Sequence, residues 1–434
     1  MKIAGSCTVS LDSADIASIM GEESACACSF KHEAPCFSMD STSLIQIGSE
    51  PRIIPLRWSR LAIFTMFAVD GIGFGTWAAF LPTFKANLAL SDGGLSIPLF
   101  AMVTGSLLTM PVAGRILTSR GSRGVVLVSA IGFSCLLPLL ALAAMAPGGF
   151  LFFTLAALLF GGSKGALDVS ANAQAVTAER AGERPLVSSC HGFWSLGLLC
   201  GSSLVAAALK FQVPPPLAML VAGLALLGLS LIATGCLRKD DQVNSAHENQ
   251  ATLWPRGRLM SLAILAFFAL FCEGAMGDWG AIYLEGEVGV SAASAAFGYS
   301  VYAMAMTVGR FAGDGLVARL GSFTLLRTSA LFVAAGLGGA LILRSHTAAL
   351  AGFVFAGLGL ANMVPILFRA AGREDRAGGA IASVATVGSF GFLIGPPIIG
   401  ALSRGVGLSH ALIVVVGFGV MIATCARLAV ERTR

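Results

Sequence analysis

Twelve long apolar stretches follow one another along the chain and are separated by short polar segments. A helix needs about 20 apolar residues to cross the hydrocarbon core of a bilayer, and each stretch is that long. The runs are continuous rather than alternating, which argues against a transmembrane barrel. The pattern therefore predicts an all-α polytopic membrane protein. The predicted spans are residues 60–84, 93–117, 123–147, 149–178, 186–209, 216–236, 258–284, 291–317, 322–343, 347–371, 376–403 and 408–430.

The composition supports a chain surrounded by lipid. Soluble domains are about 25% charged, whereas this chain is 12% charged and 56% hydrophobic, with a mean hydropathy of +0.83. Lys and Arg collect in the segments on the side of the termini, among them Arg123, Arg310 and Arg319, which predicts that both termini are cytoplasmic. The net charge of +5 is then an orientation signal and not a sign of nucleic-acid binding.

The polar stretch at residues 237–257 has no apolar period and is predicted to link two six-helix halves, at residues 58–236 and 258–434. Residues 1–57 are polar and lack the apolar core of a signal peptide, so we expect a disordered tail. An equally good interpretation is that translation starts at Met39.

The two halves repeat each other in sequence. Residues 70–81 read DGIGFGTWAAFL and residues 273–284 read EGAMGDWGAIYL, so that an acid is followed by Gly and then by Trp in both. At the second helix of each half, VAGRILTSRGS begins at residue 112 and AGDGLVARLGS at residue 312. Small residues at matching places in the fifth helices predict close helix packing: Gly197, Gly201, Gly391 and Gly395. Parallel six-helix repeats are the architecture of a large class of transporters.

Charged residues inside the fourth span raise a separate question. The segment GGSKGALDVSANAQ places Lys164 and Asp168 within an apolar helix, where an unpaired charge costs roughly 2.5 to 3.5 kcal/mol. Lys164, Asp168 and Asn172 are four residues apart and share one helix face. The partner of Lys164 is either Asp168, one turn along, or Asp70 in the first helix, and we expect Asp70 because a pair between helices can open and close.

These motifs resemble the major facilitator superfamily over roughly residues 58–430. Its signature after the second helix is Gly-x-x-x-Asp-Arg-x-Gly-x-Arg; Gly114, Gly121 and Arg123 match, while Thr118 and Ser119 replace the Asp and Arg. The second copy keeps its charges, which implies that Arg310, Asp314 and Arg319 act in conformational gating along with Gly114 and Arg123. DVSANAQA, HGFWSLG and EGAMGDW resemble a bacterial subgroup of fucose-permease-like carriers, some of which accompany rhizopine genes.

The resemblance implies that the first, fourth, seventh and tenth helices line a central cavity. Asp70, Lys164, Glu273 and Asn362 then fall near the bilayer midplane, where such carriers bind substrate. Asp70 and Glu273 recur at repeat-related positions and are predicted to carry protons. The remaining cavity candidates are Asp168, Asn172, Trp77, Trp279 and His191.

Each of these assignments has a structural alternative. Lys164 and Asp168 could form a pair that only holds the helix in register, and His191 could simply bond to Asn172 or a backbone carbonyl. Trp77 and Trp279 could stack on a sugar or polyol face, or anchor the helices at the interface.

The sequence lacks the GK[ST] ending of a phosphate loop, a metal-ligand cluster and a nucleophile elbow, so we expect neither an enzyme nor a cofactor nor a metal. The prediction is a monomeric secondary transporter in the bacterial inner membrane, moving a sugar, a polyol or a derivative by proton symport. Proton-antiport efflux of drugs or metabolites is an alternative, and a non-transporting membrane sensor is a second. By resemblance, exporters of this family carry a Gly-Pro motif in the fifth helix. Here the fifth helix has no proline and GPPIIG lies in the eleventh helix, which favours uptake.

Overall fold

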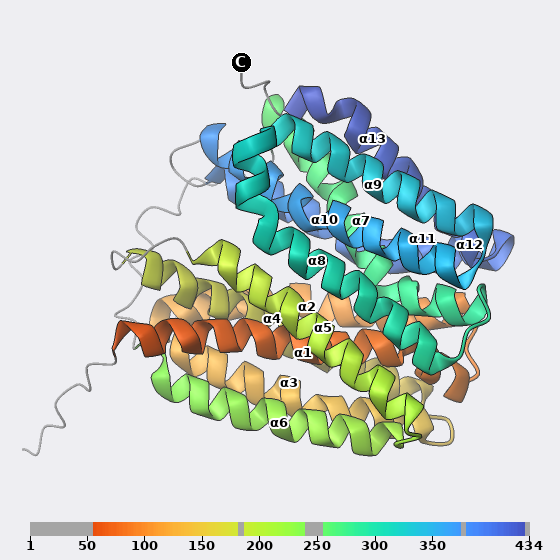
Figure 1. Ribbon diagram of the computed structural model, residues 1–434. Helices are drawn as coiled ribbons and strands as arrows, with labels where there is room; N and C mark the ends of the chain where they lie inside the picture. Colours follow the sequence, from red (N-terminus) through yellow and green to blue (C-terminus); the bar gives the residue numbers. More distant parts are fainter. Residues whose placement is uncertain (1–54, 181–185, 239–254, 375–378, 430–434) are drawn as a thin grey trace, which may run out of the picture. The chain divides into compact units, whose positions relative to one another are not determined.

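The computed structural model describes residues 55–180, 186–238, 255–374 and 379–429 and is all helical over these ranges (Figure 1). The first helix begins at Leu56, inside the segment predicted as a tail. The rest of that tail up to residue 54, and most of the predicted linker, lie outside the described residues. The helices are α1 Leu56–Asn87, α2 Asp92–Arg120, α3 Ser122–Met145, α4 Phe150–Arg180, α5 Val187–Lys210, α6 Pro215–Cys236, α7 Arg258–Gly286, α8 Ala292–Leu320, α9 Ser322–Leu343, α10 His346–Glu374, α11 Gly379–Val406, α12 Leu408–Ala411 and α13 Ile413–Ala429.

Eleven stretches of the described chain are long and apolar enough to cross a membrane. α8 has 29 residues but is not among them, and it carries Arg310, Asp314 and Arg319. α12 and α13 together make one crossing, Leu408–Arg427. With α8, twelve crossings result, as the sequence predicts, and α1 begins at the same face where α13 ends. We call this the terminal face and the other the opposite face.

We call α1–α6 the N-terminal half and α7–α13 the C-terminal half. Their sequence repeat is visible in the turns. Ser91 and Ser291 cap α2 and α8 by accepting hydrogen bonds from Gly94 N and Ser294 N. Gly121 follows the last residue of α2 and Gly321 that of α8, and their φ angles of 78° and 75° favour glycine over residues with a Cβ.

Within the N-terminal half, α1 and α5 lie in close contact along their lengths. A Cβ atom at Gly71 would lie 2.0 Å from the carbonyl oxygen of Trp194, and one at Gly197 would lie 2.4 Å from that of Ala68. Only glycine allows the two backbones to approach so closely. This approach brings the side chains of α5 next to the middle of α1.

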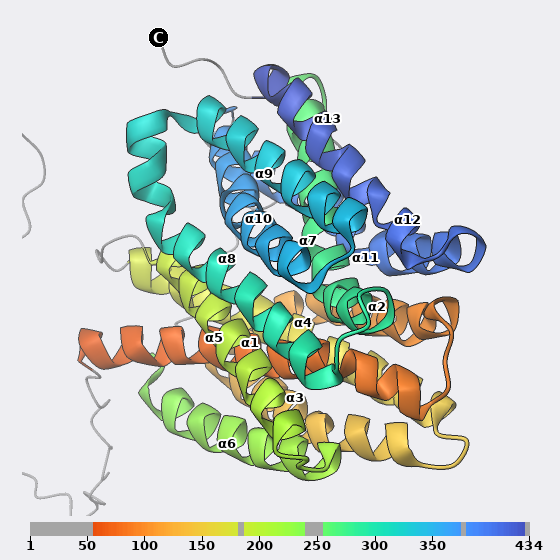
Figure 2. The ribbon, with the colours of Figure 1, turned by 45° about the vertical axis from the view of Figure 1, so that its right-hand side comes forward.

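The two halves meet mainly where α5 packs against α8, α2 against α11 and α1 against α7, with a smaller contact between α1 and α8. Figure 2 shows α5 and α8 side by side. α2 and α11 meet near the opposite face, where Gly93 packs against the Arg404 side chain and Ser96 against Gly400. The central polar residues lie between these contacts.

Candidate functional site

An ion pair joins two helices in the middle of the N-terminal half. Lys164 Nζ on α4 lies 3.1 Å from Asp70 Oδ2 on α1, and Asp70 is only 3% exposed. Both residues lie near the middle of their helices, at the depth where an unpaired charge is costly. The pair therefore satisfies the charge that the sequence placed inside the fourth span.

The predicted choice of Asp70 over Asp168 agrees with this geometry. Asp168 Oδ1 instead accepts a hydrogen bond from Asn172 Nδ2 at 3.0 Å, and among the described residues it makes no ion pair with Lys164. Asn172 also donates to the Asp168 carbonyl oxygen at 2.9 Å. Lys164, Asp168 and Asn172 do share one helix face, but only Lys164 reaches α1.

Trp194 on α5 completes this pair and was missed by the sequence analysis. Its indole Nε1 donates to Asp70 Oδ2 at 2.7 Å. Two cations also lie near its ring: Lys164 Nζ at 5.9 Å and Arg310 Cζ at 5.3 Å from the ring centroid. Cations within about 6 Å of an indole face are attracted to it. The motif HGFWSLG contains Trp194, but its spacing alone gives no sign of these contacts.

A second ion pair lies in the C-terminal half. Arg310 Nη2 on α8 is 2.9 Å from Glu273 Oε1 on α7, with side-chain exposures of 10% and 11%. Arg310 Nη1 donates across to α5, to Ser195 Oγ at 2.8 Å and to the His191 carbonyl oxygen at 3.4 Å. Among hydrogen bonds between two described residues, those that join the halves all come from Arg310.

This position corrects the assignment of Arg310 to the polar segments beside the termini. Ten residues of α8 follow it before the helix ends at Leu320, so Arg310 belongs to the buried middle of the bundle. It contacts Glu273, one of the two acids predicted to carry protons, and its guanidinium also lies over Trp194. The two ion pairs thus form one polar cluster of Asp70, Lys164, Trp194, Arg310 and Glu273, which we call the central cluster.

Two predicted cavity residues lie beside the central cluster. The His191 side chain is exposed, with its ring edge against Phe67 at a centroid distance of 5.6 Å. Asn362 on α10 is buried and donates through Nδ2 to the Gly309 carbonyl oxygen at 3.0 Å. Asn362 therefore holds α10 against α8 within one half in this structure.

The predicted stacking role of the two tryptophans conflicts with their surroundings. Trp77 is fully buried and its ring lies between those of Phe84, Phe153 and Phe160, at centroid distances of 5.6 to 6.1 Å. Trp279 is also fully buried. A sugar could reach the Trp77 ring only by displacing these phenylalanines. Trp77 therefore acts as a core residue here, and burial also rules out interfacial anchoring for both rings.

The other residues predicted to gate the conformation make no hydrogen bond or ion pair between the halves within the described chain. Asp314 pairs with Arg369 on α10, and Arg319 is exposed. A Cβ at Gly114 would meet nothing within 4 Å. Arg123 donates to the Gly235 carbonyl oxygen on α6 at 3.5 Å. The predicted ionic latch between the halves is thus not made by the Asp314 copy of the signature in this conformation.

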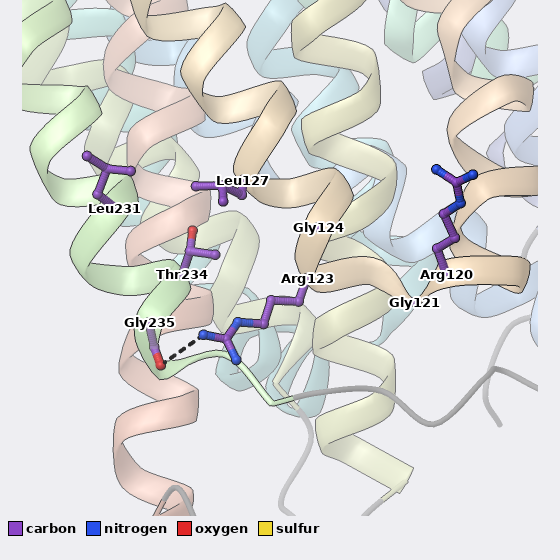
Figure 3. Close-up of a pocket in the computed structure, with 8 residues that line it drawn as sticks. All are labelled: Arg120, Gly121, Arg123, Gly124, Leu127, Leu231, Thr234 and Gly235. Atoms are coloured by element: carbon purple, nitrogen blue, oxygen red, sulfur yellow. Dashed lines mark hydrogen bonds between the residues drawn. The ribbon is translucent and has the colours of Figure 1, made fainter. Parts of the chain in front are cut away.

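Figure 3 shows the surroundings of Arg123. Arg123 lines a hollow of about 650 Å³. The other lining residues come from the α2–α3 turn, α3 and α6, so the hollow lies within the N-terminal half. Among the described residues, no group of three His, Cys, Asp or Glu side chains is placed to hold a metal ion.

Comparison with known proteins gives a consistent family match. Residues 63–374 match the Major Facilitator Superfamily. An uncharacterised MFS-type transporter of Yersinia pestis is 36% identical over 377 residues, covering 86% of this chain and 94% of that protein. The membrane protein MosC of Rhizobium meliloti is 31% identical over 378 residues, covering 86% and 90%.

Among solved structures, the fucose:proton symporter FucP of E. coli has a similar fold. The TM-score is 0.60 at 15% sequence identity, and the match covers 88% of this chain and 100% of FucP. At this identity the similarity supports the fold alone.

Proposed function

Because the chain belongs to the Major Facilitator Superfamily, we propose that it is a secondary transporter that moves a small polar solute by alternating access. The central cluster is the observation that carries this proposal. It contains two acids and two bases in the middle of the bundle, and one base bonds to both halves. In transporters built from such repeats, substrate binds near the midplane between the halves.

The proposed solute is a sugar, a polyol or a derivative. The central cluster offers charged donors and acceptors beside the aromatic rings of Trp194 and Phe74, and Lys164 Nζ lies 5.7 Å from the Phe74 centroid. Hydroxyl groups can replace the bonds between these side chains without adding net charge.

Protons are the proposed coupling ion, in symport. Asp70 and Glu273 each face one base, so protonation of either acid would free Lys164 or Arg310 to bind the solute. A charged side chain is costly at this depth, so a carboxyl group there can take up a proton and become neutral. We propose that the chain works as a monomer, since both halves of the cluster come from one chain.

The test begins with a thermal-shift screen of purified protein against sugars, polyols and inositol derivatives, because a ligand stabilises the folded state that binds it. The first solute found is then offered to proteoliposomes under an imposed pH gradient. Asp70→Asn and Glu273→Gln should abolish accumulation and retain part of the solute exchange, because an amide can hydrogen-bond but cannot cycle a proton.

Each other outcome contradicts part of the proposal. Normal accumulation by both variants would remove these acids from coupling. Extrusion of the solute against an inward proton gradient would mean efflux. Tight binding without movement by the wild-type protein would mean a sensor.

The proposed location is the bacterial inner membrane, with the terminal face in the cytoplasm. Arginines such as Arg120 and Arg373 lie at the ends of helices on that face. Reporter fusions after Lys210, at the opposite face, should behave as periplasmic, and fusions after residue 239 as cytoplasmic. The reverse pattern would overturn this orientation.

A further inference from the structure

One buried acid lies outside both ion pairs. Asp278 on α7 is 3% exposed, and within the described chain it makes no hydrogen bond and no ion pair. Asp70 and Glu273, by contrast, each have a base within 3.1 Å. An ionised carboxylate without a partner is among the most unfavourable groups that a protein interior can hold.

Two tyrosine hydroxyl groups on α8, which packs against α7, are also unsatisfied within the described chain. Tyr299 and Tyr302 on α8 are fully buried, and the hydroxyl group of each lacks a hydrogen-bond partner among the described residues. Their ring centroids are 5.7 Å apart. The Tyr299 hydroxyl lies next to the residue that precedes Asp278, since a Cβ atom at Gly277 would be 3.7 Å from Tyr299 Oη. Buried polar atoms are nearly always satisfied, so two unsatisfied hydroxyl groups on neighbouring tyrosines need an explanation.

The space around these groups limits what can bind there. A Cβ at Gly277 would lie only 3.7 Å from Tyr299 Oη, and one at Gly280 only 3.4 Å from the ring of Phe353. The same Cβ at Gly277 would lie 3.6 Å from Phe74, on α1 of the other half. Side chains therefore lie within ordinary contact distance of α7 on both sides of Asp278, and a proton needs no further space.

The charges near Asp278 are few. α7 packs against α1, α8, α10, α11 and α13. At middle depth, α1 presents Asp70, and α8 presents Tyr299, Tyr302 and Arg310, whose guanidinium is paired with Glu273. The ionisable residues of the other three helices lie within two turns of a helix end: His346, Arg369, Arg373, Glu374, Arg404, Cys425 and Arg427.

From this geometry we propose that Asp278, with Tyr299 beside it, is a proton-binding site separate from the central cluster. The site lies eight residues before the end of α7, about 12 Å from the opposite face at 1.5 Å per residue. Separation of α1 from α7 at Gly277 would open it toward that face. This inference rests on the proposed proton coupling and adds a residue through which the proton enters.

The proposed step transfers one proton and changes no other bond. The Asp278 carboxylate takes one proton from water at the opposite face and becomes neutral. The Tyr299 hydroxyl stays protonated and can donate to the carboxylate or accept from the acid. The proton leaves again as the same O–H bond breaks.

Infrared difference spectroscopy of the purified full-length protein between acidic and alkaline buffer tests this without any solute. A protonated carboxyl group gives a carbonyl band that shifts in heavy water. Wild type should show this band at acidic pH and lose it at alkaline pH. Asp278→Asn should lack the band, and Tyr299→Phe should keep it with a changed frequency or midpoint, because one hydroxyl neighbour has gone.

The control is Asp314→Asn, which removes an exposed acid paired with Arg369 and should leave the band unchanged. A band that persists in Asp278→Asn and disappears in Asp70→Asn or Glu273→Gln would overturn the proposal. An unchanged band in Tyr299→Phe would remove Tyr299 from the site. Since no transport is measured, a failure here is distinct from a failure of the transport proposal.

Discussion

Each half of the molecule has an acid in its first helix, Asp70 in α1 and Glu273 in α7, but the two halves take their base from different helices. In the N-terminal half, Lys164 comes from the fourth helix, and within the described chain its ion pair and its contacts with aromatic rings stay in that half. In the C-terminal half, Arg310 comes from the second helix, α8, and extends to α5 of the other half.

The sequence repeat shows that this difference in the position of the base comes from one residue of the second helix. AGDGLVARLGS at residue 312 lies over VAGRILTSRGS at residue 112, so Met110 stands where the C-terminal half has Arg310. A single change of residue type in the second helix therefore decides whether a half carries a base at its border with the other. We infer that the N-terminal pair stabilises its own half, whereas the C-terminal pair also holds the halves together.

The largest expected effect comes from breaking the N-terminal pair. Lys164→Ala leaves Asp70 buried without its cation, and loss of one partner of a buried pair costs about 3 to 5 kcal/mol. Folded yield and apparent melting temperature in detergent should fall sharply. Adding Asp70→Asn should restore both, and adding Asp168→Asn should not, because Asp168 is bonded to Asn172. Rescue by Asp168→Asn instead would mean that the pair lies along one helix.

A smaller difference is expected between two glycines that the repeat makes equivalent. A Cβ at Gly201 would lie 2.2 Å from the Ile72 carbonyl oxygen, whereas one at Gly395 would have its nearest neighbour at 3.8 Å, in Phe271. Overpacking typically costs about 1 to 3 kcal/mol, so Gly201→Ala should lower the apparent melting temperature. Gly395→Ala should leave it nearly unchanged. Equal losses in both variants would show that the α7–α11 contact is as tight as the α1–α5 contact.

The smallest effect is expected at the exposed pair of Asp314 and Arg369. Exposed ion pairs contribute about 0 to 1 kcal/mol, so Asp314→Asn should change the apparent melting temperature little. If the signature copy acts as a latch in another conformation, Asp314→Asn will alter solute exchange while leaving stability intact. A large loss of stability would contradict the exposed position of this pair.

Much of this fold could be predicted because bilayer crossing imposes length and hydrophobicity on each helix. The pairing of Lys164 with Asp70 could also be predicted, since a charge in a span needs a partner and few were available. Arg310 was grouped with the arginines of the polar segments, although it lies inside the predicted span 291–317, because arginine is far more common beside a span than within one. Trp194 and Asp70 are 124 residues apart, and tryptophan in an apolar helix fits core packing equally well. Only tertiary structure shows that contact.

The central claim is that Arg310 and Glu273 hold the halves together while Lys164 and Asp70 do not. Distances between spin labels at Arg120→Cys on α2 and Arg373→Cys on α10, both exposed near the terminal face, test it in a chain without native cysteines. The neutral pair Arg310→Gln with Glu273→Gln should shift the distance distribution to longer values. The matched pair Lys164→Gln with Asp70→Asn should leave it as in the parent chain. Equal shifts in both pairs, or a shift only in the second, would contradict the claim.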